Sequence, residues 1–192
     1  MAIVVTVGLL FSIVFHEMSH AAVAQHFDMP IRGITLFIFG GVAEMHKEPT
    51  SARCEFLIAL AGPATNVFLG LLFFLLFGAV KTSPGLSALA VVLWYLGFLN
   101  LFDAAFNLMP AFPLDGGRML RAALWGWRQD MIWGTRVAAG GGKIFGIVLI
   151  VLGLREVLRG DFVGGGWLAL IGLFLRGAAS VTYQQTMGRR IL

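Results

Sequence analysis

Long apolar runs constrain this chain more than any other feature. A helix rises about 1.5 Å per residue, so about 20 apolar residues cross the hydrocarbon core of a bilayer. Hydrophobic residues make up 58% of the 192 residues and charged residues 12%, against about 45–50% and about 25% in soluble domains. We therefore expect an all-α polytopic membrane protein that forms a single domain over residues 1–192. The runs predict five spans, at residues 2–27, 56–80, 86–108, 137–154 and 166–176.

One apolar segment, residues 33–43 (GITLFIFGGVA), is too short to cross a membrane. It is rich in β-branched and aromatic residues and contains a pair of glycines, which favours strands. We predict a short β-ribbon or a re-entrant segment at the membrane face, with a short interfacial helix as the alternative.

The basic residues indicate an orientation in the membrane. Arginine and lysine gather after the first, third and fifth predicted spans, and fewer lie on the opposite side. By the positive-inside rule, the end of the first span and the C-terminus are cytoplasmic. The net charge of +4 comes without a basic aromatic surface, so we expect no nucleic-acid partner. Met1 directly adjoins the first apolar run, from which we expect a further helix upstream.

The first span ends in the motif His16-Glu17-Met18-Ser19-His20. Positions i and i+4 share one face of a helix, so His16 and His20 can direct two imidazoles at one ion. Glu17 can reach the water that such an ion activates, which is the arrangement of the zinc hydrolases. Ionisable residues in a membrane helix are costly, so the motif predicts a functional metal site.

Catalytic zinc usually takes three protein ligands, and we predict Asp115 as the third. Pro110 and Pro113 interrupt the helix before it, and the glycines that follow allow unusual backbone angles. A broken helix of this kind can line a wet cavity and turn a carboxylate inward. The alternatives for Asp115 are a helix N-cap or a partner for Arg118. Two histidines and a carboxylate can also hold iron.

Several other polar residues receive weaker assignments. Asp103, inside the third span, is a ligand, a partner of a ligating histidine, or a polar contact between helices. Small residues four apart in the second and fourth spans indicate close helix packing. Asn66 lies among them, and its buried amide would need hydrogen-bond partners. We expect the remaining acidic and histidine residues near the interface to be ordinary solvated groups: Glu44, Glu48, Glu55, His26 and His46. The small residues are Gly62, Asn66 and Gly70 in the second span, and Gly142 and Gly146 in the fourth.

Four motifs in order resemble those of the site-2 proteases, which are intramembrane zinc metalloproteases. They are HEMSH, GGVAEM, AGPATN and NLMPAFPLDGGR, and the resemblance covers nearly the whole chain. The chain is most similar to the compact bacterial and archaeal group without a PDZ insertion, whose members often continue into cytoplasmic CBS domains. The resemblance implies a family core without its first helix. It also implies a polar cytoplasmic tail, residues 182–192, after which CBS domains would begin.

The resemblance also assigns roles to residues. It implies that His16, His20 and Asp115 bind Zn²⁺, that Glu17 is the general base, and that Asn107 assists near the scissile carbonyl. The GGVA ribbon would hold the substrate as an added strand. Asp103 stands where the family more often has an apolar residue.

These observations predict an intramembrane zinc metalloendopeptidase that cuts a single-span membrane-protein substrate, in regulated intramembrane proteolysis. Two rival interpretations remain open. A scaffold that keeps the fold without hydrolysis would have no need of Glu17. A transporter can also contain broken helices, but the sequence shows no inverted repeat.

Overall fold

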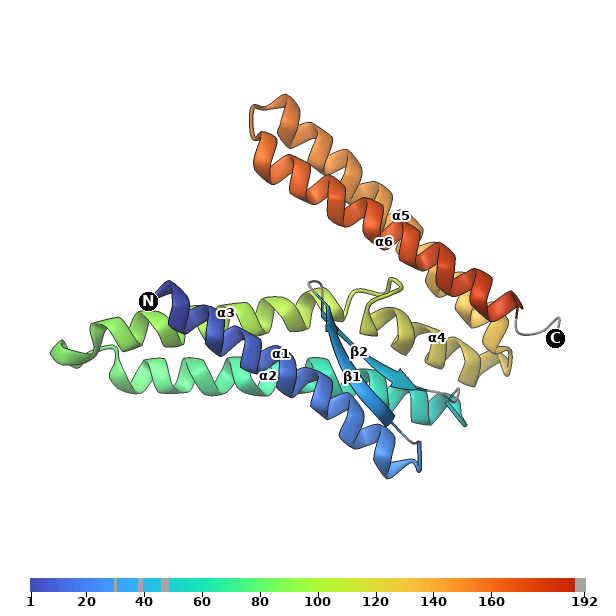
Figure 1. Cartoon of the computed structure of the whole chain (residues 1–192), viewed down its shortest axis with the longest axis horizontal. Coiled ribbons are helices and arrows are strands. Elements are labelled where there is room, and N and C mark those ends of the chain that lie inside the picture. Colours follow the sequence, from blue (N-terminus) through green and yellow to red (C-terminus); the bar gives the residue numbers. More distant parts are fainter. Residues whose placement is uncertain (30, 38–39, 46–48, 189–192) are drawn as a thin grey trace. The chain divides into compact units, whose positions relative to one another are not determined.

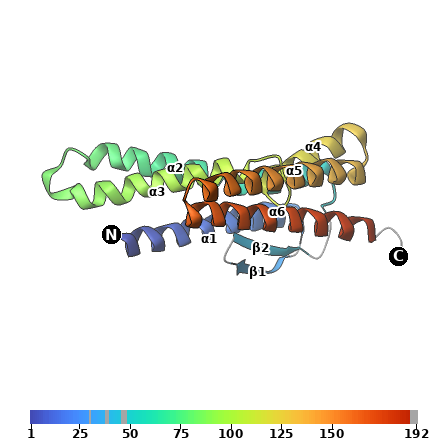
Figure 2. The same cartoon turned by 90° about the horizontal axis from the view of Figure 1, so that it is seen from above.

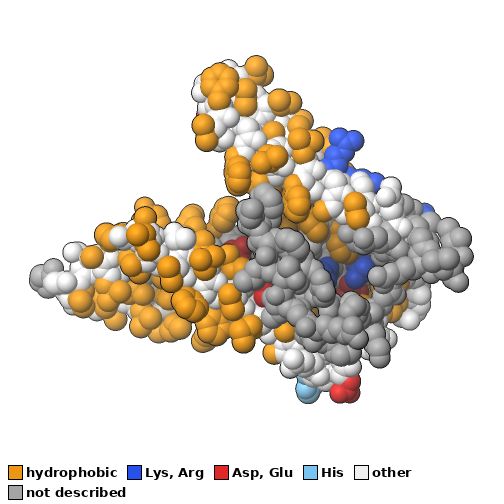
Figure 3. Space-filling view, in the orientation of Figure 1, with side chains coloured by type: hydrophobic (Ala, Val, Ile, Leu, Met, Phe, Trp, Pro, Cys, Tyr) orange, Lys and Arg blue, Asp and Glu red, His pale blue; other side chains and the backbone are white. Residues whose placement is uncertain are grey.

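The computed structural model of the chain describes residues 1–29, 31–37, 40–45 and 49–188. Hydrophobic side chains spread over the surface of its long helices (Figure 3). Leu10, Phe68 and Leu75 are each more than half exposed. Helices that are apolar on their outer faces as well as inside are suited to lipid, and the predicted polytopic all-α fold with five spans is confirmed. Among the described residues, five helices are long and apolar enough to cross a membrane: Ala2–His26 (α1), Ala52–Val80 (α2), Ser87–Asn107 (α3), Met131–Leu158 (α5) and the Phe162–Val181 part of α6.

The chain divides into two compact units. The first consists of Met1–Thr50 and Leu57–Leu108, and the second of Ser51–Phe56 and Met109–Leu192. In the first unit, α2 and α3 run side by side and are joined by the 3-10 turn η1, Pro84–Leu86 (Figures 1 and 2).

Glycines allow α2 and α3 to approach closely. A Cβ atom on Gly70 would lie 2.7 Å from the side chain of Leu101, and one on Gly97 would lie 3.1 Å from Phe74. Gly70 therefore serves helix packing, as its spacing predicted. Helix α1 is joined to α3 by a hydrogen bond of 3.1 Å from Asn100 Nδ2 to Ser12 Oγ.

The segment after α1 forms an antiparallel β-hairpin. Strand β1 (Ile31–Phe37) pairs with β2 (Gly40–Met45), and Phe37 is opposite Gly40 at the turn end. The register shifts between Ile31 and Ile34. The predicted β-ribbon is therefore observed, and β2 lies against α1 (Figure 1).

The second unit holds α4 (Asp115–Arg128), α5 and α6 (Phe162–Gly188). Helices α5 and α6 form a hairpin whose backbones meet at glycines. A Cβ atom on Gly146 would lie 2.6 Å from the carbonyl oxygen of Gly172, and one on Gly153 would lie 2.5 Å from that of Gly165. The loop before α4 docks on this hairpin through Phe112, which is buried against Ala138, Ala139 and Ala179.

Helix boundaries differ from the apolar runs in three places. Helix α2 begins at Ala52 rather than at residue 56, and AGPATN lies inside it. Helix α5 begins at Met131 because the carboxylate of Asp130 accepts hydrogen bonds from the amides of Ile132 and Trp133. Helix α6 begins at Phe162, where Asp161 accepts a hydrogen bond from the amide of Gly164, and it continues into the polar tail as far as Gly188. Caps rather than hydropathy set the starts of α5 and α6.

Candidate metal centre

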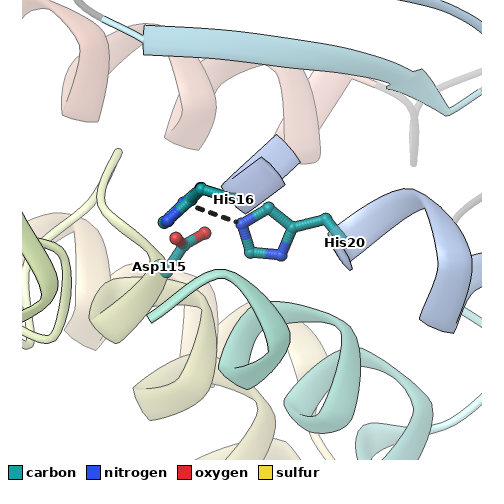
Figure 4. Close-up of side chains that lie close together, drawn as sticks. All are labelled: His16, His20 and Asp115. Atoms are coloured by element: carbon teal, nitrogen blue, oxygen red, sulfur yellow. Dashed lines mark hydrogen bonds between the residues drawn. The ribbon is translucent and has the colours of Figure 1, made fainter. Parts of the chain in front are cut away.

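His16 and His20 lie one turn apart on the buried face of α1. Each residue is 5% exposed. Their ring centroids are 4.8 Å apart with the planes at 82°, and the two Nε2 atoms are separated by 3.1 Å (Figure 4). Two nitrogen ligands about 2.0–2.1 Å from a tetrahedral ion are about 3.3 Å apart, so the pair already has the spacing of two zinc ligands.

The backbone of α2 fixes which ring nitrogen of His20 carries the proton. The Nδ1 atom of His20 is 2.6 Å from the carbonyl oxygen of Ile58. A carbonyl oxygen only accepts, so Nδ1 carries the proton and donates it. The lone pair is then on Nε2, the atom that faces His16. Contacts of this kind hold metal-binding histidines in the correct tautomer and orientation.

Gly62 on α2 keeps the space in front of both Nε2 atoms open. A Cβ atom at this position would lie 2.5 Å from Nε2 of His16 and closer still to Nε2 of His20. That point is within a few tenths of an ångström of a metal–nitrogen bond length from both rings. The side chain that Gly62 lacks would thus occupy the place of an ion, and the residues present fit a zinc ion. The sequence pattern had assigned Gly62 to helix packing only.

Glu17 is also buried, at 7% exposed, on a helix long enough to span a membrane. Burying a carboxylate is expensive unless it serves a polar site. Its place in the chain beside His16 and its burial agree with the predicted role of a base.

A second polar group in the first unit surrounds Asp103 of α3. Its carboxylate accepts hydrogen bonds from Nδ2 of Asn66 and, at 3.2 Å, from Nδ2 of Asn107. Its Oδ2 atom lies 4.0 Å from Nδ1 of His16. Asn66, which is 1% exposed, therefore has the partner that a buried amide was expected to need. Asn107 is the last residue of α3, next to the proline-containing loop.

Asp115 is the first residue of α4 and is 8% exposed. The N-cap position belongs to Leu114, so the N-cap alternative for Asp115 is wrong. The Arg118 alternative is observed, because Nη1 of Arg118 lies 3.8 Å from Oδ1 of Asp115. The predicted interruption at Pro110 and Pro113 is also present, between the end of α3 and the start of α4.

The loop before Asp115 is held in place from two sides within the second unit. The amide of Phe112 donates to the carbonyl of Ala138 at 3.3 Å. A Cβ atom on Gly117 would lie 2.5 Å from the backbone of Ala111, so only glycine allows the first turn of α4 to pack on the loop. Figure 4 draws Asp115 with the two histidines. Asp115 belongs to the second unit.

Glu55 was expected to be solvated, and this expectation is wrong. It is fully buried and accepts a hydrogen bond of 2.7 Å from Nε of Arg121. The guanidinium of Arg121 also lies 5.2 Å from the centroid of the Phe112 ring. The ion pair therefore braces α4 and the loop before it. A signal existed in the sequence, since a charged residue at the edge of an apolar run tends to be paired.

Of the two remaining histidines, His26 is exposed at the end of α1, as expected. His46 and Glu48 lie outside the described residues, and so does the side chain of Glu44.

The fold and this centre define a multi-pass membrane protein with a buried candidate metal site. The model of Peptidase family M50 matches residues 4–91 and 84–152. The chain therefore belongs to this family, that of the site-2 proteases.

Individual relatives agree with this assignment. The "Putative zinc metalloprotease Rip3" of Mycobacterium tuberculosis is 42% identical over 177 residues, which are 90% of this chain and 44% of the relative. A zinc metalloprotease of Methanocaldococcus jannaschii is 36% identical over 149 residues, covering 78% of this chain and 42% of the relative. The solved structure of the site-2 protease from M. jannaschii matches with a TM-score of 0.70 and 32% identity, over 94% of this chain and 77% of that chain. This chain thus spans less than half the length of those two curated relatives.

Proposed function

We propose that this chain is a zinc metalloendopeptidase core that hydrolyses a peptide bond in or near the transmembrane segment of a membrane protein. The observation that carries the proposal is the pair of buried Nε2 atoms of His16 and His20, 3.1 Å apart in front of Gly62. Membership of the M50 family and the zinc metalloprotease names of the relatives support it.

His16, His20 and Asp115 are the proposed ligands of the zinc ion. All three are buried, and each offers one ligand atom of a kind that zinc accepts. The start of α4 suits a carboxylate, because the positive end of the helix dipole stabilises its charge. A set of three protein ligands is that of a catalytic zinc site, which keeps one position open, whereas structural sites are closed by four.

A zinc ion supplies Lewis-acid chemistry and makes water a stronger acid. Glu17 is the proposed general base: it takes a proton from the attacking water and passes it to the leaving amine. Asn107 is the proposed donor near the substrate carbonyl, where its N–H stabilises the negative charge that develops on the oxygen. The buried Glu17 supports this function over that of a scaffold, which would need no base.

The hairpin β1–β2 is the proposed docking surface for the substrate. Hydrolysis requires an extended peptide, because the carbonyls of a helix are hydrogen-bonded and shielded. A two-stranded sheet has open edges that can pair with such a peptide. The substrate class that suits this arrangement is a single-span membrane protein whose segment unwinds locally, as regulated intramembrane proteolysis requires.

The proposed orientation places the end of α1 and the C-terminus on the cytoplasmic side, by the positive-inside rule. Four arginines follow α3 on that side: Arg118, Arg121, Arg128 and Arg136. CBS domains, where a longer form of the protein has them, would follow α6 on the same side.

The test uses the detergent-purified chain, with zinc measured per chain and cleavage of a single-span model substrate followed on gels. Glu17→Gln is expected to keep zinc and to slow cleavage by about 100-fold or more. Asp115→Ala is expected to lose zinc. Asp161→Ala, which removes an exposed carboxylate at the start of α6, is the matched control and keeps both properties. A wild-type chain without zinc, or a Glu17→Gln variant that cleaves at the wild-type rate, would refute the proposal.

A further inference from the structure

We propose that Asp103 is a positioning residue whose carboxylate orients both the imidazole of His16 and the amide of Asn107. The inference rests on the proposed function and adds to it a residue that none of the motifs contains. Asp103 lies one helical turn before Asn107 on α3 and faces His16 on α1.

The first argument is the cost of the charge. Helix α3 is long and apolar enough to span a membrane, and a carboxylate directed at lipid would be strongly unfavourable there. The side chain of Asp103 is nevertheless 36% exposed. The accessible part therefore calls for water or another polar group, and water at this depth is what a hydrolytic centre needs. The same side chain contacts two amides and an imidazole, so its placement is specific.

The second argument is the direction of the amides. An ionised carboxylate only accepts hydrogen bonds, so each asparagine must present its NH₂ group to Asp103 rather than its carbonyl. Asn107 donates to Oδ1 and Asn66 to Oδ2. An NH₂ group has two N–H donors. With one of them on Asp103, the second N–H of Asn107 is held in a fixed direction in which it can donate to a substrate carbonyl.

The third argument is the side of the His16 ring that Asp103 faces. Nε2 of His16 points to His20, while Nδ1 points to Oδ2 of Asp103 at 4.0 Å. This separation suits one bridging water rather than a direct hydrogen bond. A negative charge on the Nδ1 side favours a proton on Nδ1, which leaves the lone pair on Nε2 for the metal. Asp103 thus favours, from a longer distance, the same tautomer in His16 that the Ile58 carbonyl favours in His20.

The same geometry separates positioning from ligation. Asp103 faces the ring nitrogen that does not point at His20, so it is on the far side of His16 from the proposed ion. Its two oxygens accept from Asn66 and Asn107. Of the three roles that the sequence allows for Asp103, that of a metal ligand is therefore the least favoured.

The test is made on the full chain in detergent with Asp103→Asn and Asp103→Leu. The first keeps the shape of the side chain, and the second supplies a lipid-compatible residue in case the amide impairs folding. Asp161→Asn is the matched control, because it makes the same carboxylate-to-amide change at an exposed helix start. Zinc affinity is measured by competition with a chromophoric chelator, and the cobalt-substituted protein reports ligand geometry through its visible absorption spectrum.

Both Asp103 variants are expected to bind zinc about 10- to 100-fold more weakly than the wild type, with a changed cobalt spectrum. Asn107→Ala and the control keep the wild-type affinity. Under saturating zinc, the fall in kcat in the double variant Asp103→Asn/Asn107→Ala should be no larger than in Asn107→Ala alone, because Asp103 acts on that step through Asn107. KM should change little.

Unchanged zinc affinity and kcat in both folded variants, with an active wild type, would overturn the role of Asp103 and leave the proposed function standing. Fully additive effects of Asp103→Asn and Asn107→Ala on kcat would overturn the part that concerns Asn107. Failure of the proposed function looks different, since the wild type itself would then lack zinc or Glu17→Gln would remain active.

Discussion

Gly62→Ala should abolish tight zinc binding while leaving the fold intact. The added methyl carbon would lie 2.5 Å from Nε2 of His16, whereas ordinary van der Waals contact begins at 3.4 Å. The imidazoles must therefore retreat by about 1 Å, and the methyl group occupies the place of the ion. A misplacement of about 1 Å in a reacting or binding group can cost about 100-fold. We expect zinc affinity to fall by at least about 100-fold, or about 2.8 kcal/mol.

Gly78→Ala is the matched control for this change. Gly78 lies on the same helix, and a Cβ atom there meets nothing within 4 Å. Its zinc affinity should equal that of the wild type. Both alanines favour a helix, and the Gly62→Ala clash is with side chains rather than with backbone, so both variants should still fold in the absence of zinc. Zinc competition titration and thermal unfolding of the apo protein measure the two effects separately. A Gly62→Ala chain with wild-type zinc affinity would refute the geometry assigned to the His16 and His20 pair.

Two further predictions concern the second unit, and thermal unfolding in detergent measures both. Glu55→Gln should lower the Tm, because it leaves the guanidinium of Arg121 without its buried counter-charge and breaking a buried pair costs about 3–5 kcal/mol. An unchanged Tm would contradict the bracing role given to this pair. Gly153→Ala should lower the Tm, because its Cβ would lie 2.5 Å from the backbone oxygen of Gly165, which cannot rotate away. Gly140→Ala on the same helix, where a Cβ meets nothing within 4 Å, should not lower it.

The sequence predicted those features that depend on local periodicity. The spacing of His16 and His20 places them on one helix face whatever surrounds them, and the structure brings their Nε2 atoms together. Pro110 and Pro113 interrupt a helix by removing amide donors, and α3 ends before them. Five apolar runs predicted five spans for a similar reason, because length and composition decide which helices can cross a membrane.

Features that depend on contacts between distant segments were not predictable in the same way. The proton on His20 Nδ1 is fixed by the carbonyl of Ile58, and nothing in either local sequence announces this contact. Gly62 looked like any small residue at a helix contact, yet its neighbours are imidazoles rather than another backbone. The burial of Glu55 follows from its pairing with Arg121, 66 residues away. Pair partners of this kind follow from tertiary structure, and one sequence does not encode them in any local pattern.

Polar side chains between α1 and α3 form two groups, Ser12 with Asn100 and His16 with Asp103. Ser12 donates to the carbonyl of Gly8, and Asn100 donates both to Ser12 and to the carbonyl of Leu96. Of these bonds, the one from Asn100 to Ser12 holds the two helices together. One turn further along the same helices, His16 faces Asp103.

The hydrogen bond between Asn100 and Ser12 therefore fixes the helix register that the contact between His16 and Asp103 needs. Ser12 precedes His16 by four residues on α1, and Asn100 precedes Asp103 by three on α3, so each pair is one turn apart on its helix. A slip of either helix by one residue would move its side chains by about 1.5 Å and turn them by about 100°, which would separate both pairs at once. A hydrogen bond with no part in the chemistry thereby determines whether Asp103 faces His16.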